Sequence, residues 1–284
     1  QFNPLDIIRN IVHKINNEQY DELIPWYRGF TGTILKEKDK SYISKGSYNI
    51  ISKDTIVITE LPIGTWTQSY KTFLESLIEN DTKIQKTFIH DFTDNSTDDT
   101  VHFTVKCRPE TIKALTSDKN IDSIESMFKL TSKINLTNLH LYDTSGKIKR
   151  YENIDEIMDD YYSARLDLYI RRKQYQLKKL KSELDLNISK MKFIKDVMNE
   201  KIVIYKNSKK NIIEELIKLK YKKIDKSYDY LIKMPLYNFT IEKIQELSKV
   251  IDILVNEYET LDKLSEKDIW MRELKELVKY KKNK

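Results

Sequence analysis

The spacing of apolar positions divides the chain into two parts near residue 150. Before that point, apolar and polar residues alternate with the period of two that is typical of strands, over residues 54–61, 100–106 and 136–142. After it, apolar residues recur at steps of three and four, as on amphipathic helices. All five glycines and four of the five prolines also precede residue 150. We therefore predict an α+β domain over residues 1–150, followed by a helical extension.

Two helices are expected in the first part. One begins at Pro4 with Asn3 as its N-cap and continues to about Ile15. The second follows Gly64, and residues 26–34 between them form a glycine-containing segment that leads into strands. The second helix carries one apolar face, made of Tyr70, Phe73, Leu74, Leu77 and Ile78.

The second part has the heptad-like spacing of a coiled coil, with two apolar seams separated by a connector. The connector includes a further helix over residues 209–219, and Ser265 and Asp268 form a capping box for a last helix. This pattern predicts an antiparallel coiled coil with a small helical tip. The first seam is Leu166, Ile170, Leu177, Leu180, Leu184, Met191, Ile194 and Met198, and the second is Ile244, Leu247, Ile251, Leu254, Tyr258 and Leu261.

Charge is unevenly distributed between the two parts. The net charge is +6, but residues 1–153 have a net charge of −1, whereas residues 154–284 hold 30 Lys+Arg against 23 Asp+Glu. Solvated lysines on helix faces account for most of this excess. A nucleic-acid site in the first part must therefore depend on particular residues.

The single cysteine, Cys107, cannot form an internal disulfide, which favours a reducing compartment. It follows a predicted strand without a nearby basic partner, so we expect no reactive thiol. The sequence shows neither an apolar run of membrane-spanning length nor a secretion signal, and we expect no membrane association. A chain that opens at Gln1 suggests a processed product or a piece of a larger protein.

Sequence signatures for nucleotide binding, metal binding or a nucleophile are missing, and the four histidines share no ligand spacing. An acidic stretch could be interpreted as a cation site. It lacks the glycine and terminal glutamate of a calcium loop, so a solvated turn is the simpler interpretation. Its carboxylates are Asp91, Asp94, Asp98 and Asp99. We expect no catalytic residues and no metal site in this chain.

Several longer stretches stand out as motifs. They are residues 25–34 (PWYRGFTGTI), 58–68 (ITELPIGTWTQ), 128–130 (FKL) with 141–149 (LYDTSGKIK), 230–237 (YLIKMPLY) and 265–270 (SEKDIW). In order and spacing, over nearly the whole chain, they resemble the eukaryotic and viral branch of the type IIA DNA topoisomerases. These enzymes pass one duplex through a transient double-strand break in another.

The resemblance implies a division of the chain into the tower (or shoulder) domain, the coiled-coil arm and the exit gate (C-gate) of that family. The expected bounds are 1–150 for the tower, 151–199 for the first arm helix, 200–240 for a dimerising tip, and 241–284 for the return helix and a last helix. Double-stranded DNA, a second copy of the chain and the remaining topoisomerase domains are the implied partners. The resemblance places the parent in the nucleus if cellular, and in the host cytoplasm or virion if viral.

The resemblance also implies which parts of the parent enzyme lie elsewhere. The ATPase domain, the metal-binding carboxylates, the tyrosine that attacks DNA and the isoleucine that wedges into bent DNA are expected upstream of Gln1. Mg²⁺ and ATP would then be cofactors of the parent and not of this chain. The chain alone is expected to be inactive.

DNA contacts are implied at Trp66 and along one ten-residue segment, and Arg28 in the WYRG turn is a candidate phosphate contact. From the residues alone, the segment is an edge strand with polar alternation, Trp66 is a core aromatic, and Arg28 is a surface residue packed over Trp26. The segment is Lys129, Leu130, Thr131, Ser132, Lys133, Ile134, Asn135, Leu136, Thr137 and Asn138.

A two-fold contact at the tip needs a self-complementary apolar patch, which Leu231, Met234, Leu236 and Tyr237 are expected to supply. The alternative is that these four residues only cover the local helices. The sequence departs from the family where Gly64 replaces a basic residue of many members. It also has a short connector over residues 219–230, which suggests a compact viral or protist version.

Two other classes stay open at this point. The first is a cytoplasmic coiled-coil scaffold with an α+β docking module and no DNA role. The second is an independent metal-dependent nuclease, which the lack of a convergent carboxylate set disfavours.

Overall fold

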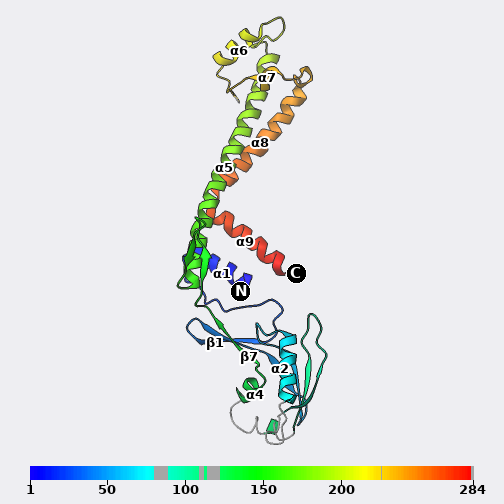
Figure 1. The fold of residues 1–284 in the computed structure, drawn as a ribbon. Coiled ribbons are helices and arrows are strands. Elements are labelled where there is room, and N and C mark those ends of the chain that lie inside the picture. The colour runs from blue at the N-terminus through cyan, green and yellow to red at the C-terminus, as the bar shows by residue number, and fades with distance from the viewer. Residues whose placement is uncertain (80–88, 109–111, 114–121, 225, 283–284) are drawn as a thin grey trace. The chain divides into compact units, whose positions relative to one another are not determined.

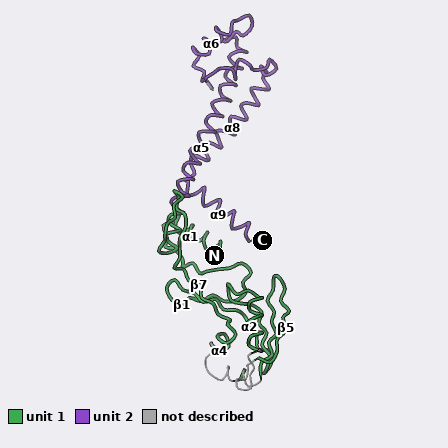
Figure 2. Tube along the Cα trace, in the orientation of Figure 1, with its two compact units in different colours: residues 1–161 green, residues 162–284 purple. Residues whose placement is uncertain are grey.

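The computed structural model describes residues 1–79, 89–108, 112–113, 122–224 and 226–282. The chain folds as two compact units, residues 1–161 and residues 162–284, coloured separately in Figure 2. The boundary falls inside one long helix, α5 (Ile154–Met198). Among the described residues, no helix combines the length and the apolar character needed to cross a membrane.

The described residues of the first unit form two antiparallel sheets and a separate hairpin. The first sheet has the order β1-β2-β7, and its strands are Thr33–Lys38, Ser41–Lys45 and Thr131–Asn135. The second has the order β3-β4-β6-β5, with strands Ser47–Ile50, Thr55–Glu60, Phe103–Cys107 and Ile89–Asp94. The hairpin pairs β8 (His140–Tyr142) with β9 (Ile148–Arg150).

The main core of this unit lies between the second sheet and helix α2 (Thr67–Glu79). Tyr70 and Leu74 are buried on the predicted face of α2, and the ring of Tyr70 meets that of Phe103 at 5.4 Å. Alternate residues of β4 and β6 point into this core, as their period-two pattern predicts. The buried strand residues are Ile56, Ile58, Phe103, Val105 and Cys107.

The predicted first helix is confirmed as α1 (Pro4–Ile15), whose first turn is capped by the side chain of Asn3. A short helix, α4 (Asp122–Met127), precedes β7. The predicted strand over residues 136–142 is wrong for its first half. Leu136 still donates its N–H to the carbonyl of Lys40, which ends the pairing with β2, and the chain becomes a strand again only at His140.

In the second unit, α5 and α8 (Ile241–Lys263) run beside each other in opposite directions (Figure 1). Lys173 of α5 donates to the carbonyl of Leu264 at 2.7 Å, just beyond the end of α8. The predicted second seam is confirmed, with Leu247 buried and the others half-buried. Ile170 and Met198 of the first seam are exposed, and Tyr169, the neighbour of Ile170, is the buried residue there.

The tip is built from α6 (Lys209–Lys218), α7 (Asp229–Ile232) and the short 3₁₀ turn η1 (Leu236–Asn238). These elements enclose their own apolar core at the end of α5. Its buried members are Phe193, Ile202, Ile212, Leu216, Tyr221, Tyr228 and Leu231. The α+β part, the long antiparallel helix pair and the small helical tip together confirm the predicted fold class.

The last helix, α9 (Glu266–Lys282), is fastened to the start of the arm by aromatic stacking. Trp270 lies between the rings of Tyr162 and Tyr169, each 5.3 Å from it. Arg172 pairs with Glu273 at 2.5 Å next to this stack. The predicted capping box also forms, since Ser265 and Asp268 each bind the backbone N–H of the other.

Replacing Trp270 by alanine should destabilise the helical unit by about 3–5 kcal/mol, because it empties a buried aromatic site. Trp270 is 2% exposed, whereas Trp66 is 78% exposed. Trp66→Ala is therefore the matched control, expected to change stability by less than about 0.5 kcal/mol. Urea unfolding followed by circular dichroism measures both, and equal losses would contradict the aromatic anchor.

Candidate nucleic-acid interface

Strand β7 carries most of the segment predicted to contact DNA, and among the described strands it lies at the edge of its sheet. Its exposed side chains alternate with half-buried ones, which confirms the edge strand expected from the residues. Thr131, Lys133 and Asn135 are exposed on one face, while Ser132 and Ile134 are half-buried on the other. The strand thus presents hydroxyl, ammonium and amide groups on a single face.

The backbone N–H and C=O groups of the three exposed β7 residues, Thr131, Lys133 and Asn135, also face outward. Gly46 donates to the carbonyl of Leu130 at 2.9 Å, and Leu136 donates to Lys40 at 2.8 Å. In an antiparallel pair, residues between such bonded positions direct their N–H and C=O groups away from the partner strand. The N–H groups of Thr131, Lys133 and Asn135 therefore point away from β2, toward the open edge.

The remaining members of the segment lie differently. Leu130 is fully buried in the core, so its side chain does not reach the surface. Leu136 is half-buried, and Thr137 and Asn138 are exposed after the strand ends. Lys129 is exposed and takes the left-handed conformation, φ 49°, that ends α4 and turns the chain into β7. Its ammonium group lies 4.2 Å from the ring centroid of Phe73.

A buried hydroxyl joins the strand to the loop that carries Trp66. Ser44 of β2 is fully buried and pairs with Ser132 in the sheet. Its hydroxyl donates to the Ser132 carbonyl at 3.4 Å and accepts the N–H of Ile63 at 3.1 Å. The position of residues 62–66 is thereby tied to β7.

The loop itself is a tight turn. Thr65 donates to the carbonyl of Pro62 at 3.0 Å, and Gly64 between them has φ 88°, a value that favours glycine. Trp66 follows at the start of α2 and is largely exposed. The interpretation of Trp66 as a core aromatic is therefore wrong, because the core beside it is filled by Leu61 and Tyr70.

A carboxylate ties the WYRGFTG segment to the same region. Glu60 ends β4, and its side chain accepts both the N–H and the hydroxyl of Thr31, at 3.0 and 2.9 Å. A Cβ on Gly32 would lie 2.1 Å from the carbonyl oxygen of Lys45, so only glycine fits this close approach to β2. Arg28, in the same segment, is exposed. The three motif segments thus meet around β2.

Sequence reasoning missed the residues that make these connections. Glu60 lies within the ITELP motif, which was a signal that it has a specific role. Ser44 lies in a strand with no distinguishing pattern, and only the paired strands and the adjoining loop reveal its function. Neither residue is placed to contact a ligand directly. Both hold the loops and the strand that carry the predicted contact residues.

We call the exposed side of this sheet the open face, made of Leu35, Glu37, Ser41, Thr131, Lys133 and Asn135. Its lysine is already paired, since Lys133 lies 3.0 Å from Glu37. The hydrogen bond from Lys133 holds the pKa of the Glu37 carboxyl below its ordinary value. Lys45 of β2 is likewise paired, at 2.6 Å, with Glu125.

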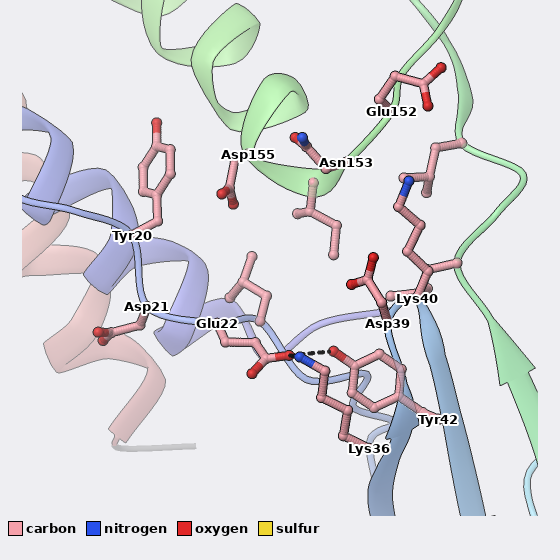
Figure 3. Close-up of a pocket in the computed structure, with 14 residues that line it drawn as sticks. Tyr20, Asp21, Glu22, Lys36, Asp39, Lys40, Tyr42, Glu152, Asn153 and Asp155 are labelled. Atoms are coloured by element: carbon pink, nitrogen blue, oxygen red, sulfur yellow. Dashed lines mark hydrogen bonds and ion pairs between the residues drawn. The ribbon is translucent and has the colours of Figure 1, made fainter.

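A polar cavity of about 350 Å³ is lined in part by the opposite side of β1 and β2 (Figure 3). Glu22 accepts from Lys36 at 2.5 Å and from the Tyr42 hydroxyl at 3.0 Å. Burial, together with the bond to Glu22, raises the pKa of Tyr42 to about 12. The other charged residues of the wall are Asp21, Asp39, Lys40, Glu152 and Asp155.

The described part of the chain contains no group of three or more His, Cys, Asp or Glu residues that could hold a metal ion. Asp94 of the acidic stretch accepts the N–H of Ser96 in a local turn. Cys107 is buried, and burial raises the pKa of its thiol to about 11. Little thiolate therefore exists at neutral pH, as expected for an unreactive cysteine.

The tip carries an apolar groove of about 880 Å³. Leu236 is 89% exposed at its rim, and the adjoining Tyr237 is 78% exposed. Met234 lines the groove and is half-buried, whereas Leu231 is fully buried in the tip core and does not reach the surface. Other apolar groove residues are Val197, Ile202, Val203, Ile204, Tyr205, Ile232 and Phe239.

A second, basic groove of about 310 Å³ lies where the arm meets the tip. Its one carboxylate, Asp185, pairs with Lys222 at 2.5 Å. Its cationic residues are Lys178, Lys181, Lys222 and Lys223.

Comparisons with known proteins agree with these motifs. The family model for the A-type subunit of DNA gyrase/topoisomerase IV matches residues 1–275. DNA topoisomerase 2 of Acanthamoeba polyphaga mimivirus is 34% identical over 97% of this chain and 27% of its own length. DNA topoisomerase 2 of Plasmodium falciparum is 32% identical over 99% of this chain and 22% of its own length. The chain thus spans about a quarter of these curated relatives.

A solved structure also covers the whole chain. The crystal structure of the Plasmodium falciparum topoisomerase II DNA-binding, cleavage and re-ligation domain matches with a TM-score of 0.80 and 32% identity. The match covers 100% of this chain and 42% of that one.

Replacing Ser44 by alanine should cost about 1–3 kcal/mol of stability, because the half-buried residue Ile63 loses the acceptor of its N–H. Ser69→Ala, on the exposed surface of α2, is the control and should stay within about 0.5 kcal/mol. Thermal unfolding of the first unit gives both values. Amide exchange at residues 63–66 should speed up in Ser44→Ala alone, and unchanged exchange there would contradict the connection.

Proposed function

Because the chain belongs to the type IIA DNA topoisomerase family, we propose that it forms the tower, arm and exit gate of an enzyme that changes DNA topology by duplex passage. The bounds proposed are 1–150 for the tower, 151–199 for the first arm helix, 200–240 for the tip, and 241–284 for the return and last helices. The tower holds the bent arms of the gate duplex. The tip pairs with its two-fold mate and opens to release the transported duplex.

The geometry of β7 is the observation that carries the DNA-binding role. In this edge strand, the residues with exposed side chains also direct their N–H groups outward. Such a strand can donate several hydrogen bonds to a phosphate backbone. Lys129 and Lys133 add positive charge, and Thr131 and Asn135 add neutral donors. These groups contact phosphates and sugars and not base edges, so the proposed binding is independent of sequence.

Trp66 and Arg28 are the further proposed contacts. Both are exposed, and Ser44 and Glu60 tie their segments to the sheet that contains β7. Preorganised loops lose less conformational entropy when they bind than free loops do. Leu130 takes part only by anchoring the strand in the core.

The arm and tip supply the proposed exit gate. Leu236 and Tyr237 protrude beside the apolar groove, so two copies related by a two-fold axis can each place these side chains in or against the groove of the other. Exposed apolar surface of this kind marks interaction sites in water-exposed proteins. The lysines of the basic groove attract the transported duplex without reading its sequence.

The chemistry of DNA cleavage belongs, in this proposal, to the remaining topoisomerase domains, which are partners of this chain. Mg²⁺ and ATP are likewise assigned, in this proposal, to those other domains as cofactors of the parent. The chain alone is proposed to bind DNA without cleaving it. The parent would act in the nucleus if cellular, and in host cytoplasm or virion if viral.

Replacing Lys129 and Lys133 together by alanine should weaken binding to a bent duplex. Each lost phosphate contact should lower the slope of log K against log salt by about 0.9. Lys53→Ala, an exposed lysine before β4, is the matched control and should leave both quantities unchanged. Fluorescence anisotropy over a salt series measures them. A scaffold protein without a DNA role would show no salt-dependent binding in any variant.

Leu236→Asp combined with Tyr237→Ala should weaken self-association of the chain at least tenfold, because it places a charge in a desolvated contact. Ile253→Asp, on an exposed position of α8, is the control and should leave the mass unchanged. Sedimentation equilibrium across a concentration series measures both. A dimer that survives the double substitution would disprove the tip as the two-fold contact.

A further inference from the structure

Glu37 occupies the open face for a structural reason. In the pairing of β1 with β2, Lys36 lies opposite Tyr42 and Lys38 lies opposite Ser41, so Glu37 is an extra residue in a β-bulge. A bulge reorients the side chain at its position. Here the Glu37 carboxylate reaches across β2 to strand β7.

Both oxygens of that carboxylate are engaged on the open face. Oε1 lies 3.0 Å from Nζ of Lys133, and Oε2 accepts a 3.2 Å hydrogen bond from the hydroxyl of Ser41. The side chain of Lys133 is 66% exposed and that of Glu37 is 27% exposed. Glu37 is therefore the more rigidly held of the two, and Lys133 is the one free to turn toward another anion.

From this arrangement we propose that Glu37 acts as an electrostatic brake on DNA binding, competing with a backbone phosphate for Lys133. The inference rests on the proposed DNA-binding function and adds the residue that sets its strength. A phosphate that binds Lys133 must displace Glu37 or share the ammonium group with it, and in either case the negative charge of Glu37 remains beside the DNA backbone. Both effects weaken DNA binding. Exchanging one anionic partner of Lys133 for another gains little binding free energy, and the Glu37 carboxylate repels the DNA phosphates.

The brake makes the contact easy to reverse. A tower that binds a duplex must also release it. A lysine that lies beside a carboxylate can exchange a phosphate for that carboxylate without becoming an unpaired charge. Glu37 is thus a positioning and affinity-setting residue and not a direct contact.

The test is the affinity of the 284-residue chain for a short duplex, measured by anisotropy over a salt series. Glu37→Gln keeps the shape of the side chain and removes its charge, and should tighten binding roughly three- to tenfold near 0.1 M salt, with a steeper slope. Glu37→Ala, which also gives up the Ser41 contact, should show the same gain. The matched control is Glu22→Gln, since Glu22 pairs at 2.5 Å with Lys36, the neighbour of Glu37 in β1, at the cavity beside the opposite face.

A double substitution shows whether Glu37 acts through Lys133. In a Lys133→Ala background, Glu37→Gln should tighten binding much less than in the unchanged chain, because the exchange of partners is lost and only the repulsion between Glu37 and the phosphates remains. An equal gain in both backgrounds, or an equal gain from Glu22→Gln, would overturn the brake in favour of a general charge effect. If Glu37→Gln does not raise the affinity for duplex while Lys133→Ala still lowers it, the brake is disproved and the DNA-binding proposal stands. A chain that shows no salt-dependent binding to duplex would overturn the DNA-binding proposal, and the brake with it.

Discussion

The buried hydroxyl of Ser44 is the interaction on which the candidate interface depends. It satisfies two backbone groups at once, one in edge strand β7 and one in the loop before Trp66. Buried polar groups are costly when unpaired, so this bond constrains both segments. Glu60, the last residue of β4, accepts the N–H and the hydroxyl of Thr31, and Gly32 allows that segment to approach β2. Three sequence motifs that are far apart in the chain therefore act as one surface.

Residues 1–153 carry a net charge of only −1, which explains why the proposed DNA contact in this part of the chain must be local. Lys133 and Lys45 each have a carboxylate partner, and the strand adds neutral donors and outward backbone N–H groups. On such a surface, the proposed binding of DNA depends on the placement of hydrogen-bond donors as much as on charge. The second unit differs, since its excess of lysine is spread over helix faces and gathers in a groove where arm and tip meet. In the proposed function, one chain thus combines a shaped contact with a diffuse attraction for DNA.

Local signals predicted much of the fold. The Asn3 cap, the apolar face of α2 and the Ser265–Asp268 capping box all depend on neighbours within a few residues, and each formed as expected. Features set by tertiary packing were not predictable in the same way. The bulge at Glu37 and the burial of Leu130 and Leu231 depend on elements distant in sequence, as does the exposure of Trp66. Motif resemblance indicated which segments matter, but not which side chains in them reach the surface.

Lysine acetylation footprinting, read by mass spectrometry with and without a bent duplex, tests the central claim most directly. The claim is that DNA lies along the edge of the β1-β2-β7 sheet. It predicts that Lys129 and Lys133 become protected when duplex is bound, while Lys53 keeps its reactivity and Lys36, at the cavity beside the opposite face, does not change. Protection of Lys36 or Lys53 with Lys129 and Lys133 still reactive would contradict the account, because the duplex would then lie elsewhere on the first unit.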